Sequence, residues 1–121
     1  MPDIRHERAR VAHARAAAWG SPDRVKKHVQ GLPVLIRNMG LAPAVALLAS
    51  STETEPLARD LAYWLVEAHP VKLMGRETES DIRGFLRAYV AMSADAARVL
   101  EEEGLRFAES LKLFAGAIHG S

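Results

Sequence analysis

The stretch from Gly31 to Ser50, GLPVLIRNMGLAPAVALLAS, contains the signals that decide the fold. Apolar residues recur in it and just before it at alternating steps of four and three, the spacing of one helix face; they are Val25, Val29, Leu32, Ile36 and Met39. Pro33 has no amide hydrogen and crowds the preceding turn, so a helix is expected to bend or restart there. The stretch therefore predicts helices that are interrupted near its proline.

A turn between two helices is predicted at Gly40. Glycine accepts a positive φ without a Cβ penalty, so Gly40 is expected at the C′ position of the first helix. Leu41 at C″ would then pack against Ile36 in a Schellman ending. Pro43 falls in the first turn of the next helix, where its missing donor costs nothing. That next helix is expected over residues 42–49.

The rest of the chain predicts further helices, because alanine is abundant, β-branched residues are few and no segment alternates as a strand does. Helices are expected over 3–19, 22–39 with the break, 42–49, 52–69, and from 78 or 80 onward. The fourth begins with a capping box, Thr52-x-x-Glu55. Gly104 either ends the last helix or lies inside one that reaches Ile118. The sequence predicts an all-α fold, a compact single-domain bundle of about five to six helices over residues 1–121.

Composition narrows the function classes. The chain has no cysteine, which excludes disulfides, thiolate metal sites and thiol nucleophiles. No apolar run reaches the ~18 residues of a membrane span, and the arginine-rich N-terminal segment lacks the apolar core of a secretory signal. A cytoplasmic location is therefore expected. The five histidines lack metal-ligand spacing, and no catalytic triad or glycine-rich phosphate loop is present, so no enzyme activity, metal or cofactor is expected.

Charge is unevenly distributed along the chain. Residues 1–40 contain eight Lys and Arg against three Asp and Glu, 8 − 3 = +5, whereas residues 41–121 contain eight against twelve, 8 − 12 = −4. This asymmetry indicates a polyanion, or a partner of complementary charge, at the N-terminal part. A solvated surface that binds neither is the alternative.

Two basic faces are candidates for phosphate contact. Arg5, Arg8 and Arg15 fall within one arc of the first helix, because steps of three and seven residues nearly realign. Lys26 and Arg37 are eleven residues apart, about three turns, and are expected on one side of the second helix. Guanidinium and ammonium groups suit phosphate oxygens. A third set of arginines is expected on a mainly solvated face of the last helix: Arg83, Arg87 and Arg98.

The aromatic and acidic residues allow more than one interpretation. Trp64 and Tyr89 lie on apolar stripes and are expected in the core. Trp19 and Tyr63 are also expected there, although either ring could stack on a nucleic-acid base. The acidic run Glu101–Glu103 is expected to be solvated or to contact a basic partner.

The opening stretch resembles the LPxLIxxxGLxxAxxxL core of the Cmr-type small subunit of type III-B CRISPR–Cas effector complexes. Weaker likeness extends over much of the chain, in Arg8-Ala9, Leu61-Ala62-Tyr63-Trp64-Leu65, the run Tyr89, Ser93, Asp95 and Ala96, and Phe107-Ala108-Glu109. The family tends to have Trp-Leu-Lys-Arg before its Phe-Ala. This chain has Glu103-Gly104-Leu105-Arg106 there, so Arg106 alone remains basic.

The resemblance implies a non-catalytic helical subunit that stacks in a short filament. Its partners would be other Cmr subunits, neighbouring copies of itself, guide RNA and single-stranded target RNA, with no membrane partner. The residues then expected to bind RNA are Arg5, Arg8, Arg15, Lys26, Arg37 and Arg106. The main alternative is a helical adaptor or homo-oligomerising protein that binds no nucleic acid. A small enzyme with a ligand pocket inside the bundle is a third class, and the well-filled apolar stripes disfavour it.

Overall fold

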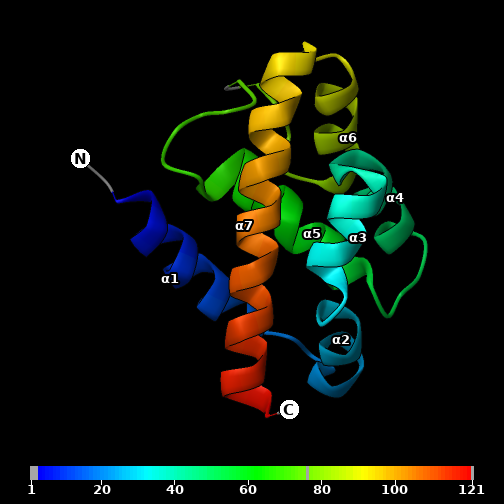
Figure 1. Cartoon of the computed structure of the whole chain (residues 1–121), viewed down its shortest axis with the longest axis vertical. Helices are drawn as coiled ribbons and strands as arrows, with labels where there is room; N and C mark the ends of the chain where they lie inside the picture. Colours follow the sequence, from blue (N-terminus) through cyan, green and yellow to red (C-terminus); the bar gives the residue numbers. More distant parts are fainter. Residues whose placement is uncertain (1–2, 76, 121) are drawn as a thin grey trace.

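The computed structural model describes residues 3–75 and 77–120, and within them every regular element is a helix (Figure 1). These elements are α1 (Ile4–Ala17), α2 (Pro22–Val29), α3 (Leu32–Met39), α4 (Leu41–Ala49), α5 (Glu55–Ala62), the π-helical η1 (Tyr63–Ala68), α6 (Ile82–Val90) and α7 (Ala94–His119). The predicted all-α class is confirmed. The described chain has seven α-helices, slightly more than the five to six expected.

The 26-residue helix α7 is the element around which the others pack. Figure 1 shows it between α1 on one side and α2 and α3 on the other. It also contacts α4, α5 and η1. Its buried residues recur at steps of three and four, as a helix face in a core requires; they are Leu100, Glu103, Gly104, Phe107, Ala108, Leu111 and Ala115. Phe107 stacks on the buried Trp64 of η1, with ring centroids 5.4 Å apart.

The helix predicted over residues 22–39 does restart, two residues earlier than Pro33. The interruption lies at Gln30 and Gly31, and Pro33 occupies the first turn of α3. A proline is tolerated there because its missing N–H would have no partner inside the helix. The proline thus begins the new helix instead of ending the old one.

Gly40 connects α3 to α4 with no other residue between them, and its φ of 89° confirms the predicted positive value. Its ψ of 161° differs from the left-handed helical value, so the predicted Schellman ending is wrong. The Gly40 N–H donates to the Ile36 carbonyl at 2.9 Å, and the Gly40 carbonyl accepts from Ala44 N–H at 3.1 Å. One residue therefore closes α3 and opens α4.

Gly104 lies inside the continuous helix α7, which decides between the two predicted alternatives. A Cβ at this position would lie 2.8 Å from Leu41 Cδ1, well inside van der Waals contact. Leu41 is the first residue of α4 and is fully buried. The absence of a side chain at Gly104 therefore leaves room for Leu41, which directly follows the turn at Gly40.

The second half of the chain departs from prediction in three places. The Thr52 capping box is wrong, because α5 begins at Glu55 after Thr54, whose hydroxyl donates to the Leu48 carbonyl at 2.6 Å. The predicted α-helix to residue 69 changes to π-helix at Tyr63. The expected long last helix is two helices, because Ser93 caps α7 by accepting from Ala96 N–H at 3.2 Å.

Replacing Gly40 by valine should lower the free energy of unfolding by about 1 kcal/mol or more, because a β-branched residue disfavours positive φ. The Cβ itself adds no crowding, since it would meet its nearest atom at 3.7 Å. Thermal or urea unfolding measures the change. Gly20→Ala is the control, because nothing lies within 4 Å of a Cβ at Gly20 and its φ is not positive. Equal stability of Gly40→Val and the wild type would contradict the strain.

Candidate nucleic-acid interface

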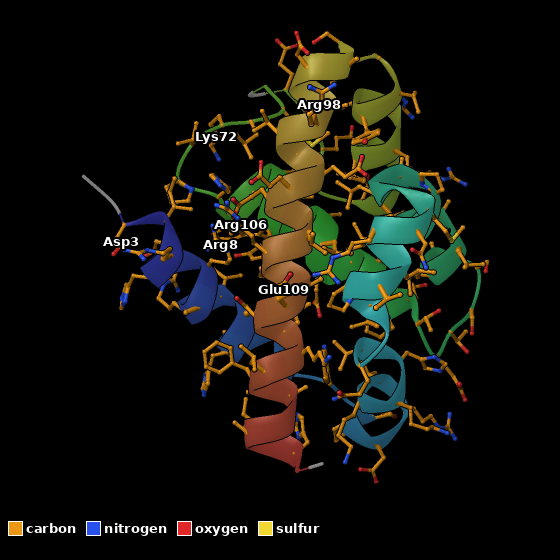
Figure 2. The ribbon with its side chains drawn as sticks, viewed as in Figure 1. Asp3, Arg8, Lys72, Arg98, Arg106 and Glu109 are labelled. Atoms are coloured by element: carbon orange, nitrogen blue, oxygen red, sulfur yellow. The ribbon has the colours of Figure 1, made fainter. Side chains whose placement is uncertain are left out.

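The three arginines predicted to share one face of α1, Arg5, Arg8 and Arg15, do not all face solvent. Arg8 is only 8% exposed, and its guanidinium makes a two-pronged ion pair with Glu103 of α7, at 2.8 and 3.1 Å. Figure 2 labels Arg8 between α1 and α7. Such a fork fits a carboxylate closely, and burial leaves little of either group for an outside ligand. The expectation that Arg8 lies on an exposed basic face is therefore wrong.

Glu103 is the centre of a buried polar cluster, so the expectation of a solvated acidic run fails at this residue. Trp64 Nε1–H donates to Glu103 Oε1 at 3.2 Å, and His69 Nε2 lies 3.7 Å from the same oxygen. Burial alone would raise the pKa of Glu103. The neighbouring His69 and the Arg8 guanidinium outweigh burial and hold that pKa at about 2. The carboxylate is therefore kept ionised inside the fold.

Arg15 makes a second bridge between helices, from α1 to α5. Its Nε–H donates to Asp60 Oδ1 at 2.7 Å, while Trp19 Nε1–H donates to Asp60 Oδ2 at 2.9 Å. Burial raises the pKa of Asp60 above its ordinary value, although both donors counteract this. The Arg15 guanidinium also lies 4.6 Å from the centroid of the Tyr63 ring. Arg15 thus remains partly exposed, at 29% of its side chain, with its direction fixed by two partners.

Lys26 and Arg37 both reach α7, at residues that are ten positions apart along it. Lys26 Nζ is 3.4 Å from the His119 carbonyl oxygen, and Arg37 Nη2 is 3.1 Å from Glu109 Oε1. Arg37 also lines a shallow groove of about 330 Å³ between α3 and α7, here called the α3–α7 groove. The other residues that line this groove are Ile36, Arg98, Glu101, Glu102 and Leu105.

The acids of the α3–α7 groove are already engaged within the chain. Glu102 pairs with Arg106 at 2.9 Å, and Glu101 accepts from the Tyr89 hydroxyl at 3.2 Å. Arg98 is exposed and has no salt bridge to another described residue. The lining of the groove has two arginines and two glutamates, so its formal charge is balanced, and Arg98 is a member that the sequence did not suggest.

The remaining predicted residues are not among those that line this groove. Arg5 is exposed near the start of α1, where no salt bridge joins its side chain to the described part of the chain. Arg106 is exposed on α7 and paired with Glu102 along the helix. The six predicted RNA-binding residues therefore do not form one site: Lys26 and Arg37 share α7, Arg8 is buried, and Arg5, Arg15 and Arg106 are dispersed.

One expectation about side chains changed because α6 and α7 are separate helices. Arg83 and Arg87 belong to α6 and Arg98 to α7, so the three do not share a face of one helix. The core placement of Trp64 and Trp19 is confirmed, at 0% and 8% exposed. Tyr63 and Tyr89 are only half-buried and pack against the core from its edge.

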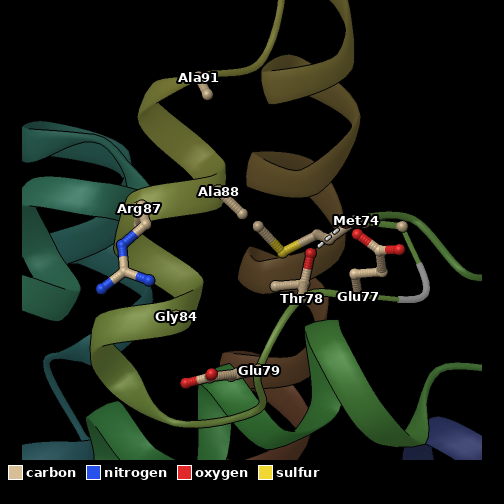
Figure 3. Close-up of a pocket in the computed structure, with 9 residues that line it drawn as sticks. Met74, Glu77, Thr78, Glu79, Gly84, Arg87, Ala88 and Ala91 are labelled. Atoms are coloured by element: carbon tan, nitrogen blue, oxygen red, sulfur yellow. Dashed lines mark hydrogen bonds between the residues drawn. The ribbon is translucent and has the colours of Figure 1, made fainter.

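A pocket of about 600 Å³ lies between α6 and the segment from Met74 to Glu79. Figure 3 shows Glu77 and Met74 on one side of α6 and Arg87 on the other, with Glu79 well away from Glu77. No nucleophile and base meet in it. Among residues 3–75 and 77–120, no group of three or more His, Asp or Glu is placed to hold a metal ion. No helix in the same part of the chain is long and apolar enough to cross a membrane.

The fold and its surface define a small all-helical protein whose exposed cations line shallow grooves. Residues 4–118 match the sequence model of the family described as CRISPR-associated protein (Cas_Cmr5). The chain belongs to this family, the small subunits of type III-B Cmr effector complexes, as the resemblance had indicated. Membership implies association with other subunits of that complex. Searches of curated proteins and of solved structures found no match.

Replacing Arg8 by methionine should lower the free energy of unfolding by about 3 kcal/mol or more, because Glu103 would be left as a buried charge without its partner. Adding Glu103→Gln should recover part of this loss, since an amide needs no counter-charge. Urea unfolding of both variants at neutral pH measures the two effects. A double variant no more stable than Arg8→Met would show that the unpaired charge is not the cause.

The low pKa of Glu103 predicts a specific acid sensitivity. Its pKa is about 2 in the fold against an ordinary 4.5, so its contribution to stability is present above 4.5 and is lost as the pH falls toward 2. The pKa of Asp60 is raised, so its protonation stabilises the fold as the pH falls. This effect is present in both the wild type and Arg8→Met and cancels in the comparison. Thermal melts over this pH range should show a larger loss of stability for the wild type than for Arg8→Met. Parallel losses would refute the assignment to Glu103.

Proposed function

We propose that this chain is a non-catalytic small subunit of the Cmr complex, which stacks on neighbouring copies and contacts the guide–target RNA backbone through the α3–α7 groove and through Lys26. The observation that carries the proposal is the convergence of Lys26 and Arg37, from α2 and α3, on the same helix α7. Arg37 lines the α3–α7 groove together with Arg98, whereas Lys26 lies outside it, at the C-terminal end of α7. Spaced cations along a shallow groove suit the regular phosphates of a strand.

The character of the groove favours backbone contact over base reading. Its lining has no aromatic ring on which a base could stack. A subunit of an RNA-guided complex has no need to read sequence, because pairing between guide and target does so. The protein's part is then to neutralise phosphate charge, which distributed Lys and Arg side chains provide.

The stacking part of the proposal is supported by large apolar side chains left exposed on the surface. Val90 at the end of α6 is 76% exposed, and Leu113 on α7 is 72% exposed. Single apolar side chains are common on protein surfaces, and larger exposed apolar patches mark sites that a partner covers. If the charged faces also contact neighbouring protein subunits and not RNA, the chain is a helical adaptor that binds no RNA.

Neutralising Lys26 and Arg37 together, as Lys26→Gln, Arg37→Gln, should weaken binding of single-stranded RNA by the isolated subunit and leave its helical circular dichroism spectrum unchanged. The wild type should bind weakly and without sequence preference. The slope of log affinity against log salt should become shallower by about 1.4, at about 0.7 for each of two phosphate contacts. Fluorescence anisotropy over a salt series measures both quantities.

A matched control exists on another part of the surface. Arg10 pairs with Glu7 at 2.8 Å as Arg37 pairs with Glu109, and Lys72 donates to the Glu67 carbonyl as Lys26 donates to that of His119. The Arg10→Gln, Lys72→Gln variant therefore loses the same charge and the same kinds of contact, away from the groove. Equal weakening in both variants would indicate bulk charge only. No weakening in the groove variant would favour the adaptor.

A further inference from the structure

A second cleft, of about 510 Å³, opens between α1, α5 and the start of α6. It is here called the Tyr63 cleft, and its lining consists of Arg15, Glu55, Arg59, Tyr63, Ser80, Asp81, Ile82 and Arg83. Three arginines from three different helices thus line a cleft together with one aromatic ring. No pattern in the sequence pointed to this site, because its members are spread over residues 15–83.

We propose that the Tyr63 cleft binds one nucleotide of single-stranded RNA, with its phosphate between Arg59 and Arg83 and its base against the Tyr63 ring. This rests on the proposed function, to which it adds a separate contact site. A cleft of this volume accommodates one nucleotide, within the usual range of ligand sites. Combining guanidinium donors with an aromatic platform is the usual way in which proteins hold a single strand.

One arginine of the cleft has no carboxylate partner, and the other two keep N–H donors that their partners do not use. Arg15 pairs with Asp60 through Nε, and Arg59 pairs with Glu55 through Nη2. Arg83 is exposed and has no salt bridge to any other described residue. Asp81 is the remaining acid, and its Oδ1 accepts from Gly84 N–H at 2.7 Å, which caps α6. Its negative charge is thereby offset by the positive end of that helix.

The backbone places Tyr63 at the cleft in an unusual way. Tyr63 is the first residue of η1, whose wide turns end with His69 N–H donating to the Trp64 carbonyl five residues earlier, at 2.9 Å. Trp64, Leu65 and Val66 are consecutive and all buried, while Tyr63 remains half-exposed. Single π-helical turns occur frequently at functional sites. Here the turn lets three successive side chains enter the core while the tyrosine ring lines the cleft.

The ring is also restrained before any ligand binds. The Arg15 guanidinium lies 4.6 Å from the Tyr63 centroid, and Arg15 is itself fixed by Asp60 at 2.7 Å. A preorganised ring loses little side-chain freedom when a base stacks on it, so more of the stacking energy appears as affinity. Arg15 is thus a positioning residue for Tyr63 in this proposal.

The test is titration of the full ¹⁵N-labelled chain with a short oligouridylate, followed by NMR, with inorganic phosphate as a parallel arm. The oligonucleotide should shift the Tyr63 amide and the Nε–H signals of Arg59 and Arg83. Phosphate alone should shift the arginines and leave Tyr63 unchanged. If both probes shift the same residues by the same amounts, the cleft binds an anion and does not bind a base, and the proposal is overturned.

Variants locate the contact independently. Arg83→Gln should weaken oligouridylate binding, while Arg87→Gln, an exposed arginine one turn further along α6, should not. Tyr63→Leu should weaken binding by at least about fivefold, and Tyr63→Phe should retain it, because the ring carries the stacking. Circular dichroism confirms that each variant is folded. Equal weakening by Arg83→Gln and Arg87→Gln would overturn the proposal.

The outcomes also separate this site from the α3–α7 groove. If Lys26→Gln, Arg37→Gln weakens binding and no variant in the Tyr63 cleft does, the cleft proposal fails and the proposed function remains. If only the cleft variants weaken binding, the groove assignment fails and the cleft remains. If no region shifts on addition of RNA, both fail.

Discussion

The ion pair between Arg8 and Glu103 is the constraint on which the arrangement of helices depends. An ionised carboxylate is costly inside a protein unless donors surround it, and Glu103 has Arg8 from α1 and Trp64 from η1 within hydrogen-bond distance. α1 buries only small or medium apolar side chains, such as Val11 and Ala12. Its position against α7 is therefore specified as much by this pair as by apolar area.

The same ion pair explains why the predicted basic face of α1 was only partly right. Periodicity shows which residues share a helix face, and it does not show which way that face points. An arginine faces solvent or the interior according to where a carboxylate lies in space. Arg8 and Arg15 have their partners 95 and 45 residues away. No local pattern connects them, so the sequence could place these arginines on an arc but could not show that two of them bridge helices.

Features set by local backbone chemistry were predictable, and features set by competition between local signals were not. Gly40, Pro33 and Pro43 each act within one turn, and the structure has a positive φ or a helix start beside each of them. The boundary between α6 and α7 was missed because the apolar spacing continues across it in the sequence, whereas in the structure Ser93 caps a new helix there. The π turn at Tyr63 has no sequence signature, since the need to bury Trp64, Leu65 and Val66 together arises only in the folded core.

Burial divides the charged groups into two sets with different responses to salt. The pairs Arg8–Glu103 and Arg15–Asp60 involve buried carboxylates, and buried pairs are screened weakly by ions. Arg83 and Arg98 are exposed in shallow clefts, where screening is strong. The fold can therefore tolerate ionic strengths at which the proposed contacts to a phosphate backbone would already be weakened. Such a separation suits the proposed role, because the buried carboxylates that anchor α1 are not among the groups that would meet an RNA strand.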